Sequence, residues 1–149
     1  MENSIFNHAS FVSIHNRILA LRPAAKRQWG KMNLVQMMRH LSVATGSGLE
    51  VYRLSDESSF ISRTFLKFFV LRILKRLPQN APAPKGFRTE TKILLNFNTE
   101  KANVLEILEL AFSSTHSIYP HPMFGKMNRN EWGTLVYRHF DHHLRQFGA

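Results

Sequence analysis

Two histidines near the end of the chain stand four residues apart in a stretch with helical periodicity. His139 and His143 occur in the sequence RHFDHHLRQ, and residues four apart lie on the same side of an α-helix. Pairs with this spacing serve in helical zinc sites, because both imidazoles can point at one ion. Trp132 and Phe140 fall on or beside the same face, so we expect the pair to point toward the core. We expect His142 to point away, toward solvent.

A third ligand has to come from another part of the chain, and two histidines qualify. The chain has no cysteine, so histidine and carboxylate are the only strong metal ligands available. His40 lies beside an apolar row, at the edge of a helix face that we expect to be buried, where an imidazole needs a polar partner. His121, between two prolines, is the second candidate, as a ligand or as a substrate contact.

Spacing alone leaves an ordinary structural explanation open. A single histidine at a helix edge is usually just hydrogen-bonded in place, and a pair near a helix C-terminus can reflect interaction with the helix dipole. Asp141 and Gln146 are more often solvated than partners of a ligand.

Three neutral imidazoles would leave an open coordination position, at which a bound water or thiol loses its proton near neutral pH. Arg145 or His121 could receive an anionic substrate there.

Four helices are predicted to position these residues. Apolar residues recur at helical spacing in four stretches, approximately 10–21, 34–48, 99–113 and 129–147. Asn33 and Asn128 are the expected N-caps of the two helices that carry histidine, with Gln36 and Glu131 completing capping boxes three residues later. The start and the phase of these two helices are therefore predicted best.

The region before the third of these helices is less regular. Residues 92–97 form a short apolar segment that is predicted to be a loop, with a strand as the alternative. The helix itself is expected to start at an N-cap on Asn98 or Thr99.

An additional helix, residues 60–77, is predicted between the second and third of the four helices. Its cations leave one sector free of charge, formed by Leu66, Phe69, Val70, Ile73 and Leu77. This sector favours packing against the body of the protein or against a second subunit over contact with an anionic membrane surface. The helix is too short and too basic to span a bilayer.

Composition narrows the classes of function. The 149 residues, 44% of them hydrophobic, suit one domain over residues 1–149, and the start of the chain lacks a secretory pattern, so we expect a cytoplasmic location. The formal charge of +10 could attract nucleic acid, anionic lipid or an acidic substrate, and a solvated basic surface is the ordinary explanation. Because the basic residues are scattered and no run of RNA-recognition type occurs, we do not expect nucleic-acid binding.

Two motifs, QMMRHL at residues 36–41 and HxxxHxxQ at residues 139–146, resemble the DinB/YfiT-like superfamily. Residues 121–148 and the sequence WGKM at residues 29–32 are most similar to an uncharacterised branch of it. The resemblance implies an all-α fold, a four-helix bundle of up-down-down-up order with an additional helix between core helices two and three. It also implies a divalent metal on His40, His139 and His143, commonly zinc or nickel, with iron as a further option.

Two classes of function follow as expectations. The first is a metal-dependent transferase or hydrolase of the DinB-like type, acting on a small molecule such as a low-molecular-weight thiol. The second is a non-catalytic binding module that uses the basic apolar helix for a homodimer or membrane-surface contact. An exchangeable metal ligand beside a pocket would indicate the enzyme, whereas a closed or empty site with an exposed apolar patch would indicate the module.

Overall fold

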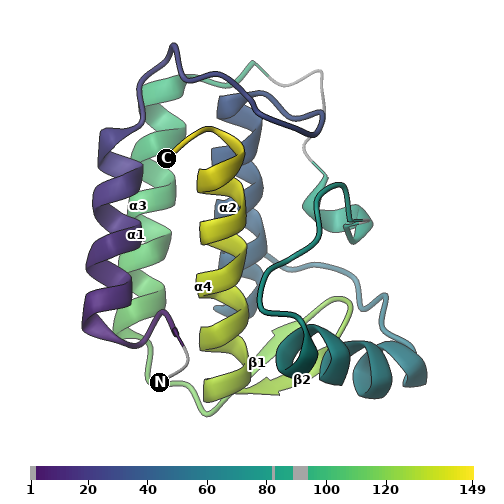
Figure 1. The fold of residues 1–149 in the computed structure, drawn as a ribbon. Helices are drawn as coiled ribbons and strands as arrows, with labels where there is room; N and C mark the ends of the chain where they lie inside the picture. Colours follow the sequence, from purple (N-terminus) through teal and green to yellow (C-terminus); the bar gives the residue numbers. More distant parts are fainter. Residues whose placement is uncertain (1–2, 82, 89–93) are drawn as a thin grey trace.

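Four long helices form a bundle in the computed structural model, which describes residues 3–81, 83–88 and 94–149 (Figure 1). They are α1 His8–Ala20, α2 Leu34–Gly48, α3 Phe97–Ser113 and α4 Arg129–Gln146. Helices α1 and α4 run in one direction along the bundle and α2 and α3 in the other, so the order is up-down-down-up. Helix α2 packs on α3 and α4, and α1 packs on the same two helices. The two helices that carry the candidate ligands, α2 and α4, are therefore neighbours.

Capping boxes start both of these helices, which confirms the prediction. The Asn33 side chain accepts a hydrogen bond from the Gln36 backbone (2.8 Å), and the Gln36 side chain accepts one from the Asn33 backbone (2.9 Å). Asn128 and Glu131 form the same pair of bonds at α4, at 3.0 and 2.9 Å. Because a helix start fixes the angular position of every later residue, these caps decide which way the histidines face.

Helix α3 begins earlier than predicted. Its N-cap is Asn96, whose side chain accepts a hydrogen bond from the Thr99 backbone at 3.1 Å, in place of Asn98 or Thr99. This start places Phe97 within the helix, packed against the core. Of the apolar segment 92–97, residues 92 and 93 lie outside the described residues, and 94–96 form irregular chain.

A β-hairpin joins α3 to α4, so the fold is mostly helical and the all-α prediction is wrong in this respect. Strand β1 Ile118–His121 pairs antiparallel with β2 Gly125–Asn128. Tyr119 is fully buried and stacks on Trp132 of α4, with 4.2 Å between the ring centroids. Pro120 lies within β1 and Pro122 directly follows it, although proline usually interrupts regular structure. Pro120 is nevertheless compatible with β1, because a two-stranded sheet consists only of edge strands, in which proline is tolerated.

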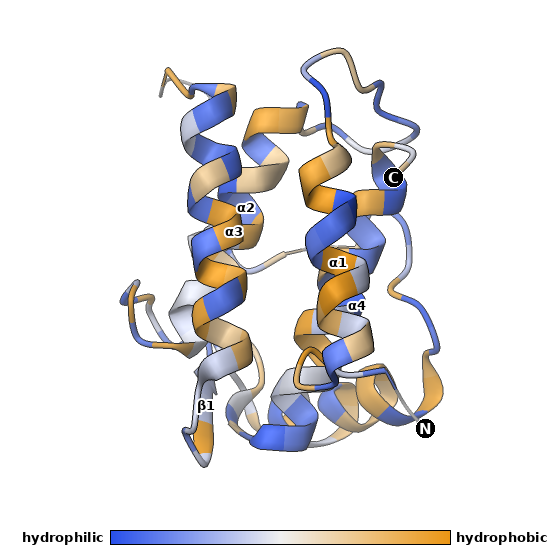
Figure 2. Ribbon diagram, turned by 90° about the vertical axis from the view of Figure 1, so that its left-hand side faces the viewer, coloured by the Kyte–Doolittle hydropathy of each residue, from blue (hydrophilic) through white to orange (hydrophobic). Residues whose placement is uncertain are grey.

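Large apolar side chains from all four helices and the hairpin fill the interior. Figure 2 shows hydrophobic and hydrophilic residues alternating along each helix, as expected for elements with one buried face. Helix α2 approaches α4 at Gly48, where a Cβ atom would overlap the Trp132 indole. This glycine lets the two helices approach each other.

The additional helix spans residues 60–73 and lies across one end of the bundle (Figure 1). It contains two π-helical segments, η1 Ser62–Leu66 and η2 Phe69–Ile73, and ends at Leu74, whose backbone is extended, before the predicted end at Leu77. No helix among the described residues is long and apolar enough to cross a bilayer.

The side of this helix that faces the protein differs from the predicted one. Ser62 and Leu71 are buried, and Val70 packs on the core, whereas Phe69 and Ile73 from the predicted sector are 47% and 57% exposed. A π-helical turn closes its hydrogen bond over five residues in place of four. A helical wheel with α-helical spacing therefore assigns the wrong residues to each face.

Candidate metal centre

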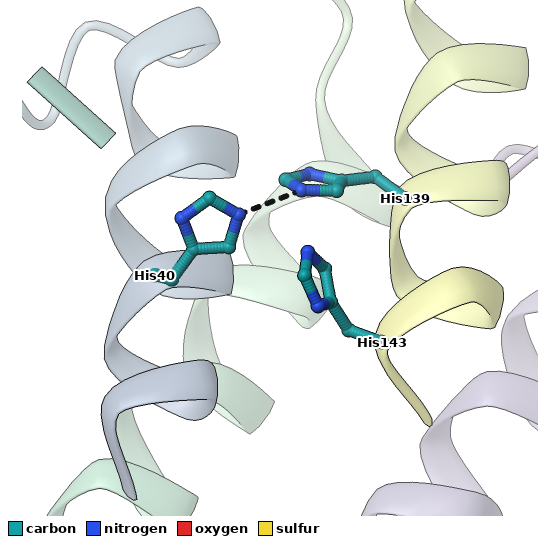
Figure 3. A group of neighbouring side chains, drawn as sticks. All are labelled: His40, His139 and His143. Atoms are coloured by element: carbon teal, nitrogen blue, oxygen red, sulfur yellow. Dashed lines mark hydrogen bonds between the residues drawn. The ribbon is translucent and has the colours of Figure 1, made fainter. Parts of the chain in front are cut away.

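His40 of α2 meets His139 and His143 of α4 inside the bundle (Figure 3). Each pair of the three imidazole ring centroids is 4.8 Å apart. One ring nitrogen of each residue lies within 4.8 Å of the other two, and these nitrogens point into a common space. His40 and His143 are buried and His139 is half-buried. The structure thus brings together the three residues that the sequence analysis selected.

A backbone carbonyl fixes the orientation of His40. Its Nδ1 lies 2.8 Å from the carbonyl oxygen of Phe87, in the short helix η3 Lys85–Phe87. Because a carbonyl only accepts, Nδ1 of His40 carries the proton, and Nε2 of the neutral ring presents a lone pair to the centre. The Nε2 atoms of His40 and His139 are 2.8 Å apart, so His139 donates this hydrogen bond.

The side chain of Gln146, also on α4, fixes the orientation of His143 by accepting a hydrogen bond from its Nδ1. The Gln146 amide nitrogen donates to the Trp29 carbonyl at 2.8 Å, which turns its Oε1 toward His143. Oε1 accepts a hydrogen bond from Nδ1 of His143, also at 2.8 Å, and so leaves Nε2 of His143 with a lone pair. Gly30, with φ +81°, makes room for this arrangement, because a Cβ there would overlap the Gln146 amide.

Burial keeps all three histidines neutral at neutral pH. It lowers the pKa of His143 to about 3 and lowers the pKa of His40 from 6.5. The pKa of His139 lies well below 6.5 through burial, and the imidazoles of His40 and His143 lower it further. Neutral imidazole is the form that binds metal, so none of the three rings has to lose a net proton, but the Nε2 proton of His139 has to move to Nδ1 for that nitrogen to become a ligand.

The donor set fits a divalent transition metal. Tetrahedral zinc, about 2.0–2.1 Å from each imidazole nitrogen, separates two ligand nitrogens by roughly 3.4 Å. The Nε2 atoms of His40 and His139 are 2.8 Å apart, and one ring nitrogen of each of the three histidines lies within 4.8 Å of the other two. The separation that zinc requires falls between these two distances. Ligand histidines commonly donate their second N–H to a carbonyl or similar acceptor, as His40 and His143 do here. Three imidazoles do not by themselves choose between zinc, nickel and iron.

His121 lies beside these three residues and is not one of the converging group. Its ring stacks on Phe124 at 4.7 Å and meets Phe87 edge-on at 5.5 Å. Nδ1 of His121 accepts hydrogen bonds from the backbone nitrogens of Met123 and Phe124, both at 3.2 Å. Since burial lowers the pKa of His121 to about 4, the ring is neutral and its proton resides on Nε2.

A surface cleft of about 700 Å³ adjoins His121. Its wall combines aromatic side chains with four cations, Arg53, Arg63, Lys67 and Lys126, and two carboxylates, Glu50 and Asp56. Arg63 pairs with Asp56 at 2.8 Å, and Lys67 pairs with Glu131 outside the cleft at 3.5 Å. The wall therefore carries an excess of positive charge.

Asp141 and Arg145 belong to an ion-pair cluster between α1 and α4. Asp141 forms ion pairs with Arg17 and with Arg145, each at 2.9 Å. Burial raises the pKa of Asp141, but hydrogen bonds from the two arginines outweigh this effect and bring the pKa below 3.8. Both residues thus have structural partners, whereas Gln146 directly supports a candidate ligand.

His142 is buried, so the prediction that it faces solvent is wrong. It is 7% exposed, its Nδ1 donates to the Leu77 carbonyl at 3.2 Å, and its ring meets Trp29 edge-on at 5.7 Å. The chain that follows the additional helix covers this side of α4. A helical wheel of α4 alone contains no information about that chain.

Two supporting groups were missed by the sequence analysis, the carbonyls of Phe87 and Trp29. Backbone carbonyls occur at every residue and have no sequence signature. Gly30, directly after Trp29, was the one available signal, because a glycine beside a conspicuous motif often marks a close approach of the backbone.

Comparison with protein families identifies the family of this chain. A family model for proteins of unknown function, DUF1569, matches residues 6–149, which include both histidine motifs, the hairpin and the additional helix. No curated protein and no solved structure matches the chain.

Proposed function

We propose that this chain, which belongs to the DUF1569 family of proteins of unknown function, is a metal-dependent enzyme. In this proposal His40, His139 and His143 hold one divalent ion, zinc or nickel in first place and iron as the alternative. The observation that carries it is the convergence of three neutral imidazoles, two of which have their outward N–H groups already bonded to acceptors. The resemblance of the two histidine motifs to the DinB/YfiT-like superfamily supports the same assignment.

The chemistry follows from the ligand set. A divalent ion held by these three imidazoles would supply Lewis-acid chemistry, by which a water molecule or thiol would lose its proton near neutral pH. The chain itself supplies rigidity: the Phe87 carbonyl holds the ring of His40, and Gln146 holds that of His143. A transferase or hydrolase that acts on a low-molecular-weight thiol or a similar small molecule fits this arrangement.

The cleft beside His121 is the proposed substrate site. His121 accepts hydrogen bonds from two backbone nitrogens at Nδ1, so its Nε2–H is available as a donor. His121 lines this cleft and also lies near His139. The excess of cations in the wall would attract a substrate that carries a carboxylate or another anionic group. In this proposal His121 orients the substrate and does not bind the metal.

Metal analysis of protein purified without added metal or a histidine tag tests the site. We expect about one ion per chain, lost in both His139→Ala and His143→Ala and retained in His116→Ala, which removes an exposed histidine. Circular dichroism of each variant would show that the fold is kept. A wild-type protein that takes up no metal even after reconstitution would refute the proposal.

A second experiment separates an enzyme from a closed structural site. Cobalt(II) in place of the native ion reports its ligands through visible absorbance, so a small thiol such as dithiothreitol should change the spectrum if one coordination position exchanges. His121→Phe should keep the cobalt spectrum but weaken the binding of an anionic thiol. A spectrum that no added thiol or anion alters would instead support the non-catalytic module, which the exposed apolar helix of residues 60–73 also favours.

A further inference from the structure

The helix of residues 60–73 exposes an unusual amount of apolar surface. Seven of the thirteen large hydrophobic side chains that are exposed in the described residues lie on it: Phe60, Ile61, Phe65, Leu66, Phe68, Phe69 and Ile73. Phe65 is 71% exposed and Phe60 76% exposed. Single exposed apolar residues are ordinary, but a concentration of them on one short helix indicates an interaction surface.

The same segment is cationic throughout. Between residues 58 and 81 the sequence contains five cations, Arg63, Lys67, Arg72, Lys75 and Arg76, and no acidic residue. Arg63 and Lys67 form ion pairs with residues outside the helix. The other three are exposed, and none forms an ion pair within the part of the chain that the structure describes. The apolar surface is thus bordered by uncompensated positive charge.

The position of the helix leaves this surface open. The helix lies across the end of the bundle, and its inner side makes the contacts to the body, through Leu71 and through the Val70 carbonyl, which accepts a hydrogen bond from Arg138 at 2.8 Å. Packing against the body of the protein, which the sequence analysis favoured, therefore accounts for only one narrow side.

We propose that this helix docks on the surface of an anionic lipid bilayer. The phenylalanines would enter the boundary between headgroups and acyl chains, and the cations would lie among the lipid phosphates, as in amphipathic helices that bind in the plane of a membrane. A second copy of the chain is a poorer occupant, because it would place Arg72, Lys75 and Arg76 of one copy against the same three cations of the other, with no acidic residue in the segment to pair with them. The formal charge of +10 adds long-range attraction to an anionic surface.

Sedimentation with lipid vesicles tests the apolar part of this proposal. The wild-type chain should bind vesicles of phosphatidylglycerol mixed with phosphatidylcholine, and bind pure phosphatidylcholine far more weakly. The double variant Phe65→Ser/Phe69→Ser should bind about a hundredfold more weakly, since each phenylalanine loses its burial in the bilayer. The control Val12→Ser/Leu110→Ser, at exposed apolar positions on α1 and α3, should bind like wild type.

A charge-matched pair of variants tests the electrostatic part. Arg72→Gln/Arg76→Gln should weaken vesicle binding by roughly tenfold or more, whereas Lys26→Gln/Lys31→Gln, with the same change in net charge, should have a much smaller effect. Equal losses in the two pairs would show non-specific attraction by net charge and overturn the proposal. Equal binding to neutral vesicles would also overturn it.

Light scattering after size-exclusion chromatography tests the competing occupant. The proposal expects a monomer in the absence of lipid. A wild-type dimer that Phe65→Ser/Phe69→Ser converts to a monomer, together with no vesicle binding, would assign the surface to a second copy and overturn the proposal. None of these measurements depends on metal, so the proposed metal centre can fail without affecting this result.

Discussion

The histidine cluster and the helix of residues 60–73 depart from the usual pattern of burial in opposite directions. The cluster buries polar rings, and the helix exposes phenylalanine and isoleucine. In the cluster, hydrogen bonds to Phe87 and Gln146 offset the cost of removing polar groups from water. On the helix, no described part of the chain covers the apolar side chains. The first region is complete within one chain, whereas the second needs a partner.

The largest expected difference is in the free energy of unfolding, when phenylalanine is replaced by alanine in each of the two regions. Phe140, beside His139 on α4, is fully buried, and Phe65 on the exposed helix is 71% exposed. Phe140→Ala should lower the free energy of unfolding by about 3–5 kcal/mol, through lost burial and a cavity. Phe65→Ala should change it by less than about 0.5 kcal/mol. Urea unfolding of both variants measures this, and a large loss for Phe65→Ala would mean that the helix is packed in solution.

A second comparison concerns glutamine. Gln146→Ala removes the acceptor for His143 and should weaken metal binding by about 10–100-fold, because the ring loses the group that fixes its orientation. Gln79→Ala, at an exposed position after the additional helix, should leave metal affinity unchanged. Competition titration with a coloured chelator gives both values. Equal affinities in the two variants would mean that the Gln146 contact does not support a ligand.

The pH dependence of stability should distinguish His121, beside the histidine cluster, from Phe124, the ring on which it stacks. With a folded pKa of about 4, His121 is neutral in the native state, but it binds a proton below about pH 6.5 when unfolded. The contribution of His121 to the free energy of unfolding is therefore complete above pH 6.5. It is lost as the pH falls toward 4, by about 1.4 kcal/mol per pH unit. His121→Phe should reduce this slope, and Phe124→Leu, which alters the same stacking without removing a titrating group, should not. Identical slopes in metal-free wild type and His121→Phe would contradict the assignment.

The smallest expected effect involves two carboxylates. Asp141 accepts hydrogen bonds from Arg17 and Arg145, and its side chain is 24% exposed. Asp141→Asn should cost about 1 kcal/mol at pH 7, and the difference from wild type should disappear as the pH falls through the lowered pKa of Asp141. Asp56→Asn, which removes the exposed partner of Arg63 near the additional helix, should have no measurable effect on unfolding. Retained metal in Asp141→Asn would agree with its role in the ion-pair cluster.

The parts of the fold that depend on local sequence could be predicted. Asn33 and Asn128 identify the starts of α2 and α4 because a capping box involves residues only three apart. The pairing of His139 with His143 is equally local. His40 could be added only through its place on a buried helix edge and through the family resemblance, because nothing local links it to α4.

The parts that depend on distant segments could not be predicted. His142 is buried because Leu77 and Trp29, far from it in sequence, lie against it. The hairpin packs on α4 through the stacking of Tyr119 on Trp132, a contact that the local sequence around the prolines does not indicate. The outward face of the 60–73 helix follows from π-helical turns, for which the sequence has no recognised signature.

The contact between His40 and His139 joins residues 99 positions apart in the sequence. Closing a loop of this length has an entropic cost that a chain recovers only when the surrounding helices pack together. His139 and His143, in contrast, come into register as soon as α4 forms. A probe placed on His40, such as its ring-proton resonance, should therefore report global unfolding, while a probe on the α4 pair should also detect local helix fraying. One cluster thus contains a local and a global reporter of folding within 4.8 Å of each other.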